Sequence, residues 1–67
     1  MTKINTEFIT LSQLLKMEDC VASGGEVKWF LSEIEVLVNG EKENRRGKKL
    51  YPGDVIEILG KTYKIES

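Results

Sequence analysis

The fold is decided by residues 23–40, which read SGGEVKWFLSEIEVLVNG. Ser23 stands three residues before Glu26, the capping-box spacing that starts a helix. Apolar residues then recur at i, i+3, i+4 and i+7, the pattern of one face of a helix of about three turns: Val27, Phe30, Leu31 and Ile34. The period changes to two over Val36–Val38, which run into Asn39-Gly40, a dipeptide suited to a tight turn. A helix that leads directly into a strand and a turn predicts a mixed α and β fold.

The residues before this stretch predict another helix. Thr10 stands three residues before Gln13, which is again the capping-box spacing. One apolar face follows, formed by Leu11, Leu14 and Leu15. We expect this helix to end near Cys20 and only two or three residues to separate it from the next. The two helices should then pack as a helix-turn-helix-like pair.

The remaining segments predict strands and turns. Alternation with polar neighbours fits a short N-terminal strand at Ile4, Thr6 and Phe8. Turns are expected at Pro52-Gly53 and Gly60-Lys61, with strands in VIEIL, residues 55–59, and TYKI, residues 62–65. Residues 41–50 are expected to form a long loop. The predicted fold class is α+β, with two helices packed on a small, mostly antiparallel sheet.

Length and composition favour one compact domain over residues 1–67, because a chain this short has no surface left to bury in a second core. A single cysteine, Cys20, and the absence of histidine exclude a disulfide framework and a zinc shell, so no metal or other cofactor is expected. Cys20 is interpreted as a small core or helix-end residue. No apolar run is long enough for a membrane span or a signal peptide, which predicts a soluble cytoplasmic protein.

Charge is distributed unevenly along the chain. Residues 42–49, called the basic segment below, hold five of the ten Lys and Arg residues and one acid, Glu43. The segment is therefore +4, and because the whole chain is −1 the remainder is −5. This asymmetry predicts a local anionic partner.

Enzyme classes are excluded by the absence of their machinery. The chain lacks a histidine for acid-base catalysis, a Ser-His or Cys-His pair, and a Gly-Lys-Ser or Gly-Lys-Thr phosphate loop. The neighbouring carboxylates of Glu33 and Glu35 fit a solvated surface better than a catalytic pair. We therefore predict a protein that is not an enzyme.

Two features favour anion binding. At Ser23, Gly24 and Gly25 the second helix begins with free N–H groups and little side-chain bulk, with Lys28 one turn further on, an arrangement that can accept a phosphate oxygen. The alternative is that the glycines only allow a sharp turn between helices. The second feature consists of the cations Arg45, Arg46, Lys48 and Lys49, whose alternative is a solvated loop.

Two aromatic residues lie beside these cations in the sequence. Trp29 is off the apolar stripe of its helix and adjacent to Lys28, so it could stack on a base, or equally pack against the loop or a strand. Tyr51 directly precedes Pro52 and leaves the same two alternatives open.

The order of these features resembles the S4 RNA-binding domain, or alpha-L motif, of a ribosomal small-subunit protein, pseudouridine synthases and tyrosyl-tRNA synthetases. The resemblance runs from about Thr10 to Ile58. Its most specific parts are the Ser-led helix start, Val-x-Val-Asn-Gly at 36–40 and Lys-x-x-Pro-Gly-Asp at 49–54. The chain looks most like the small stand-alone members of the YaaA type.

The resemblance implies a non-catalytic module that binds the phosphates of structured RNA, either rRNA or tRNA. The two helices and the loop after the Asn-Gly turn would form its RNA-binding face. It assigns RNA contacts to Ser23, Lys28, Arg45, Arg46, Lys48 and Lys49. The chain departs from the pattern at Gly24, where many relatives carry arginine, and around Glu33-Ile34, where a glycine is common. The alternatives are an adaptor that binds an acidic surface on a ribosomal or replication protein, and below it a reader of duplex DNA, which the nearly neutral second helix disfavours.

Overall fold

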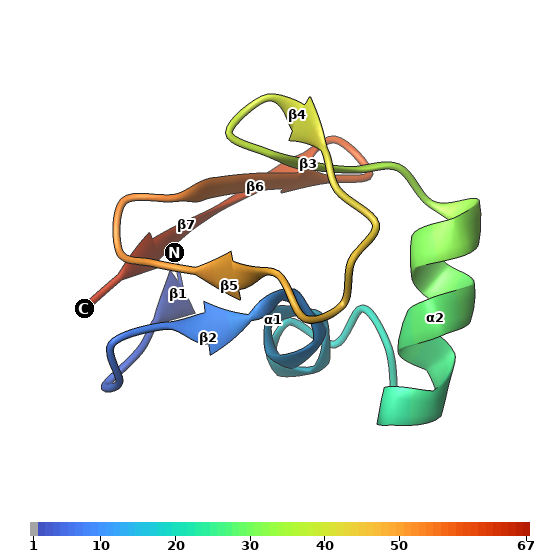
Figure 1. Ribbon diagram of the computed structural model, residues 1–67, viewed down its shortest axis with the longest axis horizontal. Helices are drawn as coiled ribbons and strands as arrows, with labels where there is room; N and C mark the ends of the chain where they lie inside the picture. Colours follow the sequence, from blue (N-terminus) through green and yellow to red (C-terminus); the bar gives the residue numbers. More distant parts are fainter. Residues whose placement is uncertain (1) are drawn as a thin grey trace.

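The computed structural model describes residues 2–67 as two helices and seven short strands. The helices are α1, Leu11–Met17, and α2, Gly24–Glu33. The strands are β1 Thr2–Lys3, β2 Ile9–Thr10, β3 Val36–Val38, β4 Glu41–Lys42, β5 Lys49–Leu50, β6 Val55–Ile58 and β7 Lys61–Glu66. In the view of Figure 1, α1 lies below the larger sheet and α2 stands at one end of it.

The start of α1 is stabilised by the predicted capping box. The Thr10 hydroxyl accepts a hydrogen bond from the Gln13 backbone N–H at 3.2 Å, and the Gln13 Oε1 accepts one from the Thr10 N–H at 2.8 Å. The predicted apolar face is fully buried, at Leu11, Leu14 and Leu15. The helix ends at Met17, three residues before Cys20, because the chain turns into the left-handed region at Asp19, where φ is 59°.

The second helix begins where its sequence predicts, with Ser23 as the N-cap residue, but without the capping box. The Ser23 side chain makes no capping hydrogen bond, and Glu26 Oε1 instead accepts from the Ala22 N–H at 2.8 Å. The apolar stripe is confirmed, since Val27, Phe30 and Leu31 are buried and Ile34 packs against them.

The connection between the helices is longer than predicted. Residues 18–23 separate α1 from α2, six residues instead of two or three. The helices still contact each other, and the connection contributes one buried residue, Val21, to the core. The longer connection allows the chain to turn at Asp19 and to bury Val21 before α2 begins.

Five strands form the larger sheet, in the order β1-β7-β6-β3-β4, and β2 pairs with β5 in a second, two-stranded sheet. All pairs are antiparallel except β1 with β7, in which Thr2 lies opposite Ile65. The predicted α+β class, with two helices packed on a mostly antiparallel sheet, is confirmed. One core lies between these layers, formed by Ile4, Ile9, Leu11, Leu14, Leu15, Val21, Val27, Phe30, Leu31, Val36, Val38, Leu50, Ile56, Ile58 and Ile65.

The hairpin after β3 has the predicted turn. Asn39 and Gly40 both adopt positive φ, 53° and 86°, as a two-residue turn between right-twisted strands requires. Asn39 also secures the turn at residues 51–54, because its side-chain amide donates to Asp54 Oδ1 at 3.1 Å and its Oδ1 accepts from the Val55 N–H at 3.0 Å.

Three further local predictions are wrong. Residues 4–8, expected to form a strand, instead form a bend that connects β1 to β2, which belong to different sheets, and the Thr6 hydroxyl donates to the Phe8 carbonyl within that bend. The ends of the expected loop over 41–50 form β4 and β5 because each finds a partner strand. The last turn lies at Leu59-Gly60, one residue earlier than predicted, with positive φ at both residues.

Candidate functional site

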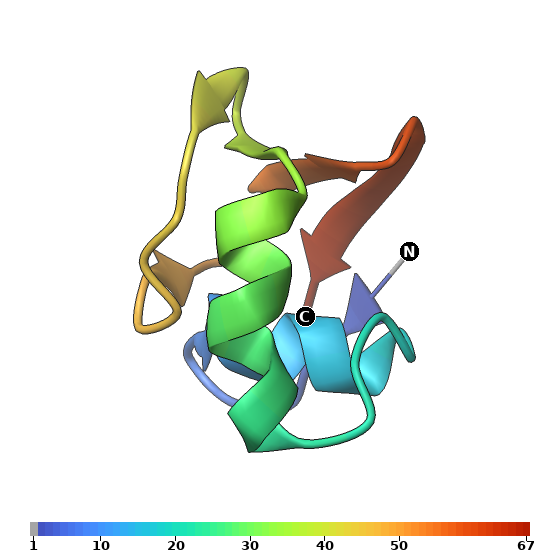
Figure 2. The ribbon, with the colours of Figure 1, turned by 90° about the vertical axis from the view of Figure 1, so that its right-hand side faces the viewer.

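The basic segment is attached to the first turn of α1 through its backbone. The Leu11 N–H donates to the Lys48 carbonyl and the Ser12 N–H to the Arg46 carbonyl, both at 2.9 Å. The first N–H groups of a helix have no partner within the helix, so the segment supplies acceptors that α1 requires. A further bond within the segment, from the Lys48 N–H to the Arg45 carbonyl at 3.1 Å, closes its turn. The cationic side chains are therefore carried on a fixed backbone, which is seen beside α2 in Figure 2.

Two of the five cations of the basic segment form ion pairs with carboxylates of the same chain. Glu43 Oε2 accepts from Arg45 Nε at 2.9 Å and Glu43 Oε1 accepts from Arg45 Nη2 at 3.1 Å, a two-pronged pair. The hydrogen bonds from the Arg45 side chain lower the pKa of Glu43 to about 2. Lys42 Nζ lies 3.3 Å from Glu35 Oε2. The other three cations, Arg46, Lys48 and Lys49, form no ion pair with any residue between 2 and 67.

Two surface hollows are lined by the cations of the basic segment that form no ion pair in residues 2–67. The Lys28 hollow, of about 350 Å³, separates the segment from α2 and is lined by Lys28, Leu31, Ser32, Asn44 and Arg46. The Tyr51 hollow, of about 460 Å³, lies on the side of β5 and is lined by Arg45, Gly47, Lys48, Lys49 and Tyr51. The structure thus places Lys28 of α2 at the same hollow as Arg46. It places Tyr51 at the same hollow as Lys48 and Lys49.

The start of α2 is exposed but lines neither hollow. Side chains would have open space at Gly24, and a Cβ at Gly25 would meet only the Ser23 hydroxyl at 3.9 Å. Ser23, Gly24 and Gly25 could therefore admit an anion to the helix N–H groups. The carboxylate of Glu26 lies at the same helix end, however, and its negative charge opposes a second anion there. The role predicted for these three residues stays a prediction.

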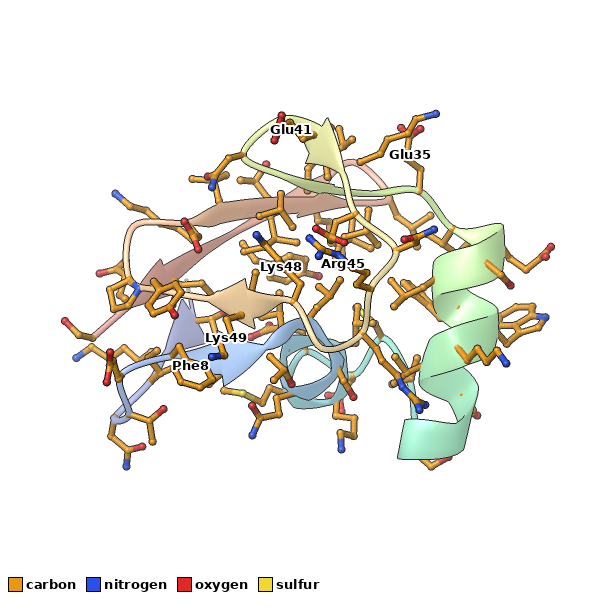
Figure 3. All side chains as sticks on the ribbon, in the orientation of Figure 1. Phe8, Glu35, Glu41, Arg45, Lys48 and Lys49 are labelled. Atoms are coloured by element: carbon orange, nitrogen blue, oxygen red, sulfur yellow. The ribbon has the colours of Figure 1, made fainter. Side chains whose placement is uncertain are left out.

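An aromatic pair beside the basic segment was missed by the sequence analysis. The rings of Phe8 and Tyr51 lie with centroids 5.6 Å apart and are tilted by 47°. Lys49 Nζ lies 5.0 Å from the centroid of the Phe8 ring, a cation–π contact. Figure 3 shows Lys49 beside Phe8, with Lys48 and Arg45 across β5 from them. The pair results from the β2–β5 pairing, for which no local sequence signal exists.

Trp29 and Cys20 have different surroundings. Trp29 is 65% exposed on α2, which argues against the alternative that it packs against the loop or a strand. Cys20 is half-buried against the core, and burial raises the pKa of its thiol, as its interpretation as a small core or helix-end residue implies.

The described part of the chain carries no group of His, Cys, Asp or Glu residues that could hold a metal ion. Among the same residues, neither helix is long and apolar enough to cross a membrane.

Comparison with known proteins agrees with this architecture. A family model described as the S4 domain matches residues 2–66. The chain is also 67% identical over 57 residues to the "Probable ribosome maturation protein RlbA" of Bacillus subtilis (strain 168), an alignment that covers 85% of this chain and 80% of that protein. The match of the family model over nearly the whole chain confirms the resemblance found in the sequence, and the chain belongs to the S4 domain family.

Proposed function

We propose that this protein is a non-catalytic RNA-binding module that holds phosphates of a structured RNA with its basic segment and with Lys28 of α2. The observation that carries the proposal is the attachment of the segment to α1, which presents Arg46, Lys48 and Lys49 from a fixed backbone and leaves them without acidic partners in residues 2–67.

A fixed cationic surface favours the binding of RNA phosphates for two reasons. The backbone of the segment is already ordered, so RNA binding loses little backbone entropy. Each phosphate that is neutralised also releases condensed counterions, which adds to the affinity at low salt. Contacts of this kind read the shape of the RNA backbone and carry little sequence information, so we expect low sequence specificity.

Ribosomal RNA is the proposed ligand class, in preference to tRNA. The support is the name of the Bacillus subtilis relative, which refers to ribosome maturation. A cytoplasmic location fits this role. If RNA binding fails, the result points to the adaptor function, in which the same cations bind an acidic protein surface.

The test is a fluorescence-anisotropy titration of a labelled ribosomal RNA hairpin over a series of salt concentrations. We compare the wild type with Arg46→Gln/Lys48→Gln and with the matched control Lys16→Gln/Lys64→Gln, which removes two exposed cations outside the basic segment. If each lost phosphate contact lowers the slope of log K against log salt by about 0.7–0.9, the first double variant loses about 1.4–1.8 and the control loses little. Equal losses in both variants, or an affinity no tighter than non-specific binding, would overturn the proposal.

The same titration tests the start of α2. If Ser23, Gly24 and Gly25 admit a phosphate, Glu26→Gln removes the opposing charge and strengthens RNA binding by about two- to fivefold. The control is Glu33→Gln at the other end of the helix. No gain over this control would exclude the helix start from the interface.

A further inference from the structure

Tyr51 is held rigidly at the edge of the Tyr51 hollow. Its N–H donates to Asp54 Oδ2 at 2.8 Å, and its carbonyl accepts from the Asp54 N–H at 2.9 Å. Asp54 is itself held by Asn39, as described above. Both bonds between Tyr51 and Asp54 involve the backbone of Tyr51, so its position does not depend on what its ring contacts.

The two aromatic rings differ in what they offer to a ligand. Phe8 is half-buried, and the Lys49 ammonium lies over its ring. Tyr51 is 42% exposed and contacts Phe8 in a tilted arrangement. Phe8 therefore supports Tyr51 from the side, and the Tyr51 ring is the aromatic surface accessible to a flat partner.

Cations line the same hollow as this ring. Lys48 and Lys49 form no ion pair in the described residues, and Gly47, which has no side chain, lines the hollow with them. The hollow is an open surface depression of about 460 Å³ that contains the Tyr51 ring and these cations together. An aromatic surface with adjacent free cations suits a nucleotide, in which a planar base is joined to an anionic phosphate.

We propose that the Tyr51 hollow binds one unpaired base of the RNA, stacked on the Tyr51 ring, while Lys48 contacts a neighbouring phosphate. This inference rests on the RNA-binding function proposed above and narrows its ligand to structured RNA with an unpaired nucleotide beside a helix. Trp29 is more exposed than Tyr51, but it lines neither the Lys28 hollow nor the Tyr51 hollow, so it lacks the combination of ring and cation.

The test uses two labelled hairpins that differ only in one bulged adenosine. The wild type is expected to bind the bulged hairpin about tenfold more tightly, because a stacked base is worth about five- to a hundredfold in affinity. Tyr51→Leu keeps apolar contact with Phe8 but removes the aromatic face, and should bind both hairpins equally. Tyr51→Phe should retain the preference, as should the matched aromatic control Trp29→Ala.

The outcomes separate the two proposals. If the wild type binds both hairpins with equal affinity and a steep salt dependence, the base site is wrong and the RNA-binding function stands. Loss of the preference in Trp29→Ala, but not in Tyr51→Leu, likewise overturns the base site. If neither hairpin binds above the non-specific level, the proposed function fails, and the base site fails with it.

A second measurement needs no substitution. A hairpin with 5-iodouridine at the bulge is irradiated in complex with the wild-type protein, and the crosslinked peptide is identified by mass spectrometry. Stacking on Tyr51 predicts a crosslink within residues 49–54. A crosslink to Trp29, or to no residue of the Tyr51 hollow, contradicts the proposal.

Discussion

At the scale of single residues, the pairing of Glu43 with Arg45 changes how the charge of the basic segment is interpreted. The sequence gives the segment +4, yet the guanidinium of Arg45 is already bonded to a carboxylate whose side chain is only 11% exposed. Arg45 therefore shares its charge with Glu43, whereas Arg46, Lys48 and Lys49 have no acidic partner in residues 2–67, and the RNA contact predicted for Arg45 stays a prediction. Of the two adjacent arginines, only Arg46 is left without an acidic partner in residues 2–67.

This pairing predicts a pH-dependent stability. The pKa of Glu43 is about 2 in the folded protein, below its unfolded value of about 4.3. The contribution of the pair is therefore present above about pH 4.3 and is lost as the pH falls toward 2. Glu43→Gln should lower the free energy of unfolding at pH 7 by about 0.5–1 kcal/mol, and the difference from the wild type should vanish near pH 2.

Urea denaturation between pH 7 and pH 2 measures this effect. Glu41→Gln is the matched control, because Glu41 is exposed and makes no ion pair in the described residues. A difference between wild type and Glu43→Gln that stays constant over this range would contradict the assignment.

At the scale of elements, the two helices have the same starting pattern in the sequence and different caps in the structure. Thr10 and Gln13 bond each other reciprocally, whereas the Ser23 side chain bonds nothing at the helix end. We expect Thr10→Ala to destabilise the protein by about 1 kcal/mol and Ser23→Ala to change its stability by only a few tenths.

Thermal unfolding followed by circular dichroism compares these two variants under the same conditions. Because both substitutions remove one hydroxyl from an N-cap position, each controls for the other. Equal destabilisation would show that Ser23 caps α2 in solution.

The elements also show which parts of the fold the sequence could predict. The helices and the Asn39-Gly40 turn followed from spacings of four residues or fewer, and the structure confirms them. The β2–β5 pairing joins Ile9 to Leu50, and no local period reports a contact across that distance. The candidate site was therefore predictable in its cations but not in Phe8, which reaches Tyr51 only through this pairing.

At the scale of the whole molecule, Leu50 connects the candidate site to the core. Its side chain is fully buried in β5, directly after the basic segment. Replacing a fully buried leucine with alanine costs about 2–5 kcal/mol, and a domain of this size has only about 3–5 kcal/mol of stability. Leu50→Ala should therefore leave much of the protein unfolded at 25 °C.

The control for this substitution is Leu59→Ala, which removes the same atoms from a side chain that is 70% exposed. It should shift the free energy of unfolding by less than about 0.5 kcal/mol. Guanidinium denaturation of both variants checks the contrast. Equal stability of the two would mean that β5 does not hold the basic segment on the core.

The parallel pairing of β1 with β7 affects when the molecule can fold. Thr2 pairs with Ile65, so β1 cannot add to the edge of the larger sheet until residues 61–66 have been synthesised. Closing a loop over so much of the chain is slow and costs entropy that local contacts do not offset. The N-terminal strand therefore emerges during translation without a partner, and the sheet is completed only after residues 61–66 have left the ribosome.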